Sequence, residues 1–258
     1  MLDIQRASLL KRLSAALLDF ILLLILSVGA GWLTSLISNY DEHINKVEEY
    51  YNYYNEKYDI DLLGTSDKYK DLNEDEQRAY DERYQQANEE YSHDKEAIKE
   101  FSLVMNLSLI IVSIGVFFGV FISEFIIPLF LKNGQTVGKK VFSICVIKNN
   151  CVKMSNFQLF VRTIIGKYTI ELMIPILLTL AILFGIVDII GTIVIIGILI
   201  TQIILLFATK NHTVIHDAFA FTVVVDYASQ KIFENEQEMI NYKTKLHEEE
   251  VKRIKTYW

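Results

Sequence analysis

Ionisable residues inside long apolar stretches are the residues most able to do chemistry in this sequence. Arg12 and Asp19 are seven residues apart, so in a helix they share one face and lie about two turns from each other. Glu124 interrupts a second apolar stretch. Charged groups are costly inside a membrane and often mark ion or proton pathways there. The pattern predicts a cation- or proton-binding cluster, because carboxylates that face a wet cavity can titrate.

A purely structural role for the same charges is the alternative. In that interpretation acidic and basic side chains pair and lock the helix ends together, the acids being Asp19, Glu124 and Glu171 and the bases Arg12, Arg162 and Lys167. The middles of the apolar stretches carry hydroxyl and amide groups but no carboxylate. Transporters with alternating access bind substrate at that depth, so this absence weakens the transport hypothesis without excluding it.

Four apolar segments are long enough to position these charges in a membrane. A bilayer core about 30 Å thick is crossed by roughly 20 apolar helical residues. Leu13–Ser38 and Phe101–Leu131 each meet this requirement. The next apolar run is about twice that length and predicts a helical hairpin, Tyr168–Val187 and Ile189–Ala208, with Asp188 in the turn. The sequence therefore predicts an all-α protein with a four-helix transmembrane bundle in a lipid bilayer.

Basic residues near the span ends predict the orientation, because they are retained on the cytoplasmic side. They precede the first span, gather between the second and third, and are missing from the hairpin turn. These residues are Arg6, Lys11, Arg12, Lys132, Lys139, Lys140, Lys148, Lys153, Arg162, Lys167 and Lys210. Both termini are predicted in the cytoplasm, and Asn39–Glu100 outside a bacterial cell membrane. A cleaved signal peptide is disfavoured, because the first apolar run continues through Trp32 and Leu36.

The segment Asn39–Glu100 is acidic and rich in tyrosine. It holds 19 Asp and Glu against 8 Lys and Arg, a net charge of −11, which leaves +4 for the rest of the chain. Apolar and tyrosine residues recur at alternating spacings of three and four, as in a coiled-coil seam. The first series is Tyr40, Ile44, Val47, Tyr51, Tyr54 and Tyr58, and the second is Tyr80, Tyr84, Ala87, Tyr91, Asp94, Ile98, Phe101 and Met105.

These series predict that the first two spans continue without a break into an antiparallel helical hairpin over residues 39–101. A helix from Leu13 to Tyr58 would then be a rod of about 70 Å. The turn is expected around Leu63–Asp67. A disordered acidic loop is the alternative interpretation. Exposed tyrosines would also suit a protein or glycan partner, although a packed seam uses the same residues.

The composition, 258 residues with 52% hydrophobic and a net charge of −7, excludes a soluble globular domain and disfavours a nucleic-acid binder. Cys145 and Cys151 predict no disulfide framework, because both fall on the predicted reducing side. Gly115 and Gly119 form a small-xxx-small pattern for close helix packing, within the bundle or between copies in a homo-oligomer. Residues 227–258 carry six basic and six acidic residues and predict a cytoplasmic surface or partner-binding helix.

Polar motifs follow the second and fourth spans. The first reads Gln135-Thr136-Val137-Gly138-Lys139, which lacks the length and the strand-to-helix setting of a phosphate-binding P-loop. The segments Val141–Ile147 and Thr222–Asp226 are β-prone and predict a small strand pair on the cytoplasmic surface. His212 and His216 have the spacing of a helical metal pair, but no third ligand is evident, so neither a metal nor a cofactor is predicted.

Together these motifs resemble the RDD family of small bacterial membrane proteins, which is named for one arginine and two aspartates. The resemblance rests on Arg12 with Asp19, the Gln135–Lys139 turn, Arg162, and the His216-Asp217 pair with Thr222. It covers residues 7–38 and 102–226, and on it Arg12, Asp19 and Asp217 are the three naming residues. Asn149-Asn150-Cys151, where Asp-Gly would be typical, and the long outer insertion depart from the family pattern.

The resemblance implies a membrane protein for which transport of unknown ligands is suggested, with sodium–proton antiport proposed for some members. The polar cluster expected to carry this function is Arg12, Asp19, Glu124, Lys139, Arg162, His216 and Asp217. The second hypothesis is a non-catalytic scaffold or sensor that binds a protein partner through residues 39–101. An enzyme is not expected, because the sequence offers no nucleophile–base pair, catalytic metal set or cofactor loop.

Overall fold

The computed structural model describes residues 4–63, 69, 72–131, 133–183, 185–187 and 189–256. Four of its helices are long and apolar enough to cross a membrane: Leu9–Ile37, Lys95–Leu131, Asn156–Leu183 and Ile189–Ala208. The four predicted spans are confirmed at this level. The third begins earlier than predicted, because Ser155 caps it by accepting a hydrogen bond from the Gln158 N–H. The predicted turns at Asp188 and at Gly64–Asp67 lie outside the described residues.

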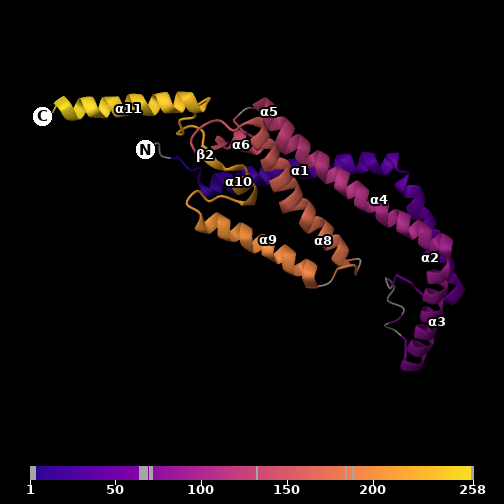
Figure 1. The fold of residues 1–258 in the computed structure, drawn as a ribbon. Helices are drawn as coiled ribbons and strands as arrows, with labels where there is room; N and C mark the ends of the chain where they lie inside the picture. The colour runs from indigo at the N-terminus through magenta and orange to yellow at the C-terminus, as the bar shows by residue number, and fades with distance from the viewer. Residues whose placement is uncertain are drawn as a thin grey trace. The chain divides into compact units, whose positions relative to one another are not determined.

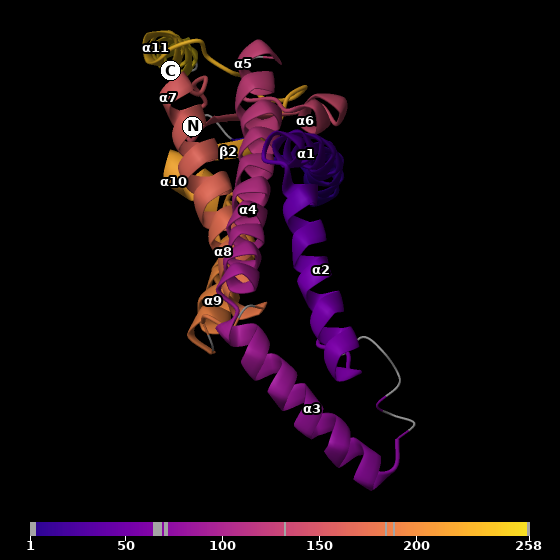
Figure 2. The same ribbon diagram turned by 90° about the vertical axis from the view of Figure 1, so that its right-hand side faces the viewer.

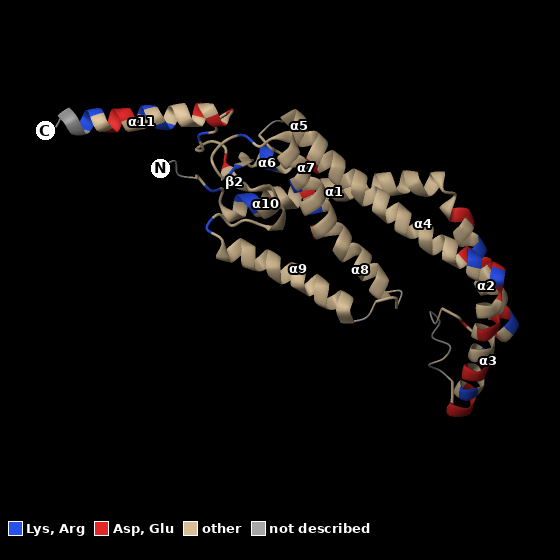
Figure 3. Cartoon of the chain, in the orientation of Figure 1, with Lys and Arg blue, Asp and Glu red and all other residues tan. Residues whose placement is uncertain are grey.

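The chain divides into two compact units. The first comprises Met1–Ala30 and Gly115–Trp258, and the second comprises Gly31–Ile114. Charged residues concentrate in α2 and α3 of the second unit and in α11 of the first, whereas α8 and α9 carry none along their length (Figure 3). Helices α1 (Leu9–Ile37) and α4 (Lys95–Val120) each have residues in both units.

Two π-helical segments mark the apolar helices of the first unit. One, η2 (Phe121–Ile126), joins α4 to α5 (Ile127–Leu131), and the other, η3 (Val161–Met173), joins α7 (Asn156–Phe160) to α8 (Ile174–Leu183). Figure 2 shows α7 and α8 in line.

A proline follows closely on each π-helical segment. Pro128 comes four residues after Glu124, and Pro175 comes four residues after Glu171. Proline lacks an N–H and its ring clashes with the carbonyl four residues earlier, so the regular α-helical ladder cannot continue through either site. The helices widen at two of the acidic residues as a result.

The predicted strand pair is present in the first unit. β1 (Ile144–Lys148) pairs antiparallel with β2 (Thr222–Asp226), with Val146 opposite Val224. Val141, which was expected in the strand, instead ends the short helix α6 (Val137–Val141). The reason is that the Thr136 side chain accepts from the Lys139 N–H and so starts a helical turn. The cytoplasmic location of the pair stays a prediction.

The remaining helices of the first unit follow this core. α8 packs against α9 (Ile189–Ala208) as a hairpin, and α10 (Ile215–Ala220) packs against η3 beside β2 (Figure 1). The C-terminal helix α11 (Glu236–Thr256) is anchored at its start, where Met239 packs against Phe233 and the buried face of the strands.

The second unit contains α2 (Tyr40–Tyr58), α3 (Glu74–His93) and parts of α1 and α4. Side-chain contacts run antiparallel between α2 and the α3–α4 segment, joining Tyr40 to Ser108, His43 to Glu100, Tyr54 to Asp94 and Lys57 to Glu90. Tyr54 and Tyr91 are buried at the centre, with rings 5.6 Å apart. A coiled-coil seam over the whole hairpin stays a prediction.

The predicted unbroken helices are wrong at two residues. Asn39 adopts a left-handed conformation (φ 51°), which ends α1 before α2 begins, so the 70 Å rod is not formed. Asp94 is extended and its carboxylate accepts from the N–H groups of Glu96 and Ala97, which caps α4 and separates it from α3. Asn and Asp compete in this way with the helical ladder, so a seam-like spacing alone did not guarantee continuity.

Candidate functional site

Asp19 is buried in α1 and holds the start of α6. One carboxylate oxygen accepts from the Thr136 hydroxyl at 2.5 Å, and the other accepts from the Gly138 N–H at 2.7 Å. A Cβ on Gly138 would lie 2.2 Å from the Ala15 carbonyl oxygen and 2.9 Å from the Asp19 Cγ. A residue without a side chain is therefore required where α6 meets α1.

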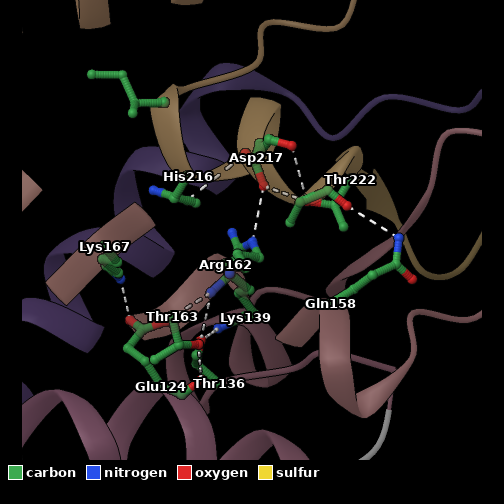
Figure 4. A network of polar contacts seen from close by, with 12 residues as sticks. Glu124, Thr136, Lys139, Gln158, Arg162, Thr163, Lys167, His216, Asp217 and Thr222 are labelled. Atoms are coloured by element: carbon green, nitrogen blue, oxygen red, sulfur yellow. Dashed lines mark hydrogen bonds and ion pairs between the residues drawn. The ribbon is translucent and has the colours of Figure 1, made fainter. Parts of the chain in front are cut away.

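Glu124 lies fully buried between two lysines. Lys167 donates to one of its oxygens, and the Lys139 Nζ lies 3.7 Å from the other, Oε2, which has no hydrogen-bond partner within the described residues (Figure 4). The Lys139 Nζ is also 3.9 Å from the Asp19 Oδ2. Burial lowers the pKa of Lys139 to about 8, against the attraction of the Glu124 carboxylate. Lys139 therefore links Asp19 and Glu124 electrostatically.

Asp217 forms the second ion pair of the cluster. Its Oδ1 accepts from the Arg162 Nε at 3.0 Å and from the Thr222 hydroxyl at 3.1 Å. Its Oδ2 lies 3.9 Å from a terminal nitrogen of Arg12 and, within the described residues, has no hydrogen-bond partner. Burial opposes ionisation of Asp217, but Arg162 outweighs it and lowers the pKa of the carboxyl to about 2. Asp217 is therefore charged at neutral pH.

His216 lies between two carboxylates. Its Nδ1 is 2.8 Å from the Glu171 carboxylate, and its Nε2 is 3.8 Å from the Asp217 Oδ2. Burial and the positive charge of Arg162 lower the pKa of His216, although both carboxylates oppose this. The imidazole is therefore neutral at neutral pH.

Close packing and the fourth span hold this histidine in place. A Cβ on Gly166 would lie 2.6 Å from the His216 Cβ, so glycine permits the contact between η3 and α10. Gln202 of α9 donates to Glu171 and accepts from the Ile215 N–H, which ties the fourth span to the start of α10. Residues of η3 and α9 therefore position α10, the helix that carries this histidine.

A cavity of about 370 Å³ borders the cluster. Its charged and polar lining consists of Arg12, Asp19, Lys139, Arg162, Lys167, Glu171, Gln202, His216 and Asp217. Its apolar lining comes from the beginning of α1, from the end of α9 and from the strands and the segment before α10; these residues are Leu9, Leu13, Ala15, Ala16, Leu206, Ile144, Val224 and Val214. The volume falls in the range of about 300–1,000 Å³ that is typical of small-molecule sites.

A model described as the RDD family matches residues 6–221, which is most of the chain. The chain belongs to the RDD family. Comparisons with curated proteins and with solved structures gave no match.

The structure places the seven predicted site residues of this RDD protein in two contacting groups. Lys139 links Asp19 and Glu124, and Asp217 links Arg12, Arg162 and His216. Both groups contribute side chains to the same cavity. Two of the three residues assigned by the family resemblance, Arg12 and Asp217, approach each other at 3.9 Å, whereas Asp19 binds α6.

The ion pairs in the RDD protein agree only in part with the alternative in which acidic and basic side chains lock the helix ends together. Lys167 pairs with Glu124 as that alternative allows, but Arg162 pairs with Asp217, and Glu171 pairs with His216. Thr163 and Gln202 were not assigned to the cluster from the sequence, and Gly138 was quoted only as part of the Gln135–Lys139 turn. The prolines four residues after Glu124 and Glu171 were the available signal for the helix distortion.

The two histidines of the RDD protein do not form the helical pair that their spacing suggested. His212 has a positive φ of 49° and precedes α10, and its Nδ1 lies 2.8 Å from the Leu206 carbonyl oxygen. Within the described residues, no group of three or more His, Cys, Asp or Glu side chains is arranged to hold a metal ion.

Proposed function

We propose that this RDD protein is a non-enzymatic, proton-coupled transporter of the bacterial cell membrane, and that His216 is the group that binds and releases the proton. The observation that supports this most is the position of the imidazole. It borders the cavity and has a carboxylate at each ring nitrogen, Glu171 at 2.8 Å and Asp217 at 3.8 Å. Titratable groups at such sites commonly form proton relays.

The proton step follows from the hydrogen-bonding capacity of the ring. In the neutral imidazole, the nitrogen beside Glu171 carries the hydrogen and Nε2 is a bare acceptor. Nε2 then faces the Oδ2 of Asp217, an acceptor that has no hydrogen-bond partner among the described residues. Protonation of His216 would supply a donor between these two atoms. Burial and Arg162 oppose charging of the ring, whereas Asp217 and Glu171 favour it.

The sequence predicted that the cluster binds either a metal cation or a proton. The contacts of Asp19 favour the proton. Both Asp19 oxygens accept hydrogen bonds, from Thr136 and from the Gly138 N–H, and the Lys139 Nζ lies 3.9 Å from Oδ2, so a cationic side chain already lies beside this carboxylate. We assign to Asp19 the positioning of α6 and Lys139. Sodium–proton antiport, as the family resemblance implies, would use the same proton step at His216.

Flux measurements on the purified full chain in sealed vesicles would test this proposal. A pH-sensitive dye inside the vesicles reports proton movement when a pH or sodium gradient is imposed. We expect His216→Gln to abolish coupled proton flux, and His247→Gln on the exposed face of α11 to leave it unchanged. Equal flux in His216→Gln and the unmodified protein would refute the role of His216. The absence of flux in the unmodified protein would refute transport.

The orientation predicted from the basic residues belongs to the same proposal, with both termini cytoplasmic and residues 39–101 outside. Ser92→Cys in α3 and Ser229→Cys after β2 place single exposed thiols on the two predicted sides. The native thiols of Cys145 and Cys151 are buried. A membrane-impermeant maleimide should label Ser92→Cys on intact cells and Ser229→Cys only after permeabilisation.

A scaffold or sensor function is the second candidate, and a groove in the second unit favours it. The groove, about 800 Å³, is lined by Tyr50, Tyr53 and Tyr54 together with Lys46, Glu49, Glu90, Asp94 and Glu100. Aromatic rings with nearby carboxylates suit a basic segment of a partner protein. Crosslinking at this groove should then recover one specific protein, and a fully functional deletion of residues 39–101 would count against this candidate.

A further inference from the structure

Arg12 differs from the other cations of the polar cluster because none of its guanidinium donors forms a hydrogen bond to a described residue. Lys167 donates to Glu124, and Arg162 donates to Asp217. The Arg12 guanidinium makes no hydrogen bond to any described residue, and its nearest carboxylate oxygen is 3.9 Å away. A guanidinium has five N–H donors in a planar fork that matches a carboxylate or phosphate. Arg12 also lines the cavity, so those donors are accessible from it.

The side chains that line the cavity include one more base than acid, and the buried Glu124 behind them pairs with two of the bases. The charged side chains that line it are four bases, Arg12, Lys139, Arg162 and Lys167, and three acids, Asp19, Glu171 and Asp217. His216 adds a further positive charge when it is protonated. An anion and a proton would therefore favour each other's binding at this wall, because each offsets the charge of the other.

Part of the apolar lining of the cavity belongs to two helices that are long and apolar enough to cross a membrane. Leu9 and Leu13 are 42% and 56% exposed at the beginning of α1, and Leu206 lies in the last turn of α9. Arg12 is in the first turns of α1, at the same end of the span as these leucines. The cavity thus combines a cationic head-group site with an apolar surface at the end of two membrane spans.

From this arrangement we infer that the cavity binds an amphiphilic organic anion, with its carboxylate or phosphate head on Arg12 and its apolar chain against α1 and α9. The inference rests on the proposed transport function and names its substrate class. A cationic amphiphile would place its head against the excess of basic side chains. A small inorganic anion would leave the apolar lining of the cavity uncovered. An amphiphile would bind more tightly, because its hydrocarbon chain buries apolar surface there.

Binding to the purified full chain in a neutral detergent, followed by native mass spectrometry, tests the inference. The probes are dodecanoate and dodecyl phosphate as anionic amphiphiles, dodecyltrimethylammonium with the same chain and opposite charge, and acetate and inorganic phosphate as heads without a chain. Phosphatidylglycerol and phosphatidylcholine are compared in parallel to distinguish a lipid from a free solute. We expect stoichiometric binding of dodecanoate and dodecyl phosphate. Binding of dodecyltrimethylammonium, acetate and inorganic phosphate should be at least about tenfold weaker.

Three variants locate the site. Arg12→Gln should weaken binding of the anionic amphiphile by about tenfold or more, and Arg12→Lys should restore part of the affinity. The matched control is Lys11→Gln, which removes the neighbouring charge, whose partner is Asp226 rather than the cavity. Ala16→Trp, at an exposed position that lines the cavity, should block binding without disturbing a packed core.

The outcomes separate the inference from the proton proposal. Binding of dodecanoate but not of phosphatidylglycerol identifies the ligand as a soluble amphiphile, and the reverse result identifies it as an anionic lipid. Either result supports an anionic head on Arg12 with an apolar chain in the cavity. Equal binding of the cationic amphiphile, or unchanged binding in Arg12→Gln, overturns it. Lack of binding together with proton flux that depends on His216 would overturn the inference and leave the transport proposal standing.

Discussion

The hydroxyl of Thr163 donates a hydrogen bond of 3.0 Å to the main-chain carbonyl oxygen of Glu124. This carbonyl would normally accept from the residue four positions later, but that residue is Pro128, which has no N–H. The contact therefore compensates for the proline and joins the second and third spans beside the buried Glu124 side chain. Pro128, Thr163 and Glu124 thus form one structural unit, in which the threonine supplies the donor that the proline lacks.

Thr163→Val should destabilise the protein, because the buried carbonyl would lose its donor while the side-chain shape is kept. The expected cost is about 1–2 kcal/mol. Thermal unfolding in detergent, followed by the helical circular dichroism signal, would measure it. Thr163→Ser keeps the hydroxyl and is the control; an equal loss in both variants would mean that packing, not the hydrogen bond, stabilises this contact.

Gly138→Ala should be more damaging than a glycine-to-alanine change elsewhere in the bundle. The added Cβ would lie 2.2 Å from the Ala15 carbonyl oxygen, so α6 would have to move away from Asp19. Overpacking of this kind costs about 1–3 kcal/mol. The control is Gly29→Ala in α1, where nothing lies within 4 Å of the added atom and helix propensity favours alanine. The unfolding temperature should fall in the first variant and stay level or rise in the second.

The spans were predictable from sequence, because a membrane core requires an uninterrupted apolar run of fixed length. The fourth span, Ile189–Ala208, agrees at both ends. The helix breaks at Asn39 and Asp94 were not predictable from periodicity, since they depend on a positive φ and on a carboxylate that caps the next helix. A repeat of three and four residues reports which face is apolar and says nothing of either effect.

Membership of the polar cluster was predictable, but its pairing was not. A charge in an apolar run must find a partner, so Arg12, Asp19 and Glu124 were expected to meet other charges. Which acid meets which base depends on the three-dimensional placement of α6, η3 and α10. Arg162 pairs with Asp217 because η3 packs against α10, and that contact requires Gly166 at the crossing.

The Asp217–Arg162 pair should make stability depend on pH in the acidic range. The folded-state pKa of Asp217 is about 2, below the ordinary value of 3.8, so the folded state favours the charged carboxylate. The stabilisation is fully present above about pH 4 and is lost as the pH falls towards 2. The difference in unfolding temperature between the unmodified protein and Asp217→Asn should shrink over this window. Asp41→Asn, at an exposed site in α2, is the control for the loss of one carboxylate.

Asp94 tests whether the α3–α4 break is built into the chain. Its carboxylate accepts from the Glu96 and Ala97 N–H groups and from the Tyr54 hydroxyl at 3.0 Å, and these contacts hold the pKa of Asp94 below its ordinary value. Asp94→Ala removes the cap and the tyrosine partner and should cost about 1–2 kcal/mol, whereas Asp94→Asn keeps an acceptor and should cost less. Hydrogen exchange of the amides of residues 95–98 should quicken in the alanine variant. If those amides instead became more protected, α3 and α4 would have fused into one helix, and the cap would be an obstacle to the continuous seam rather than a stabilising feature.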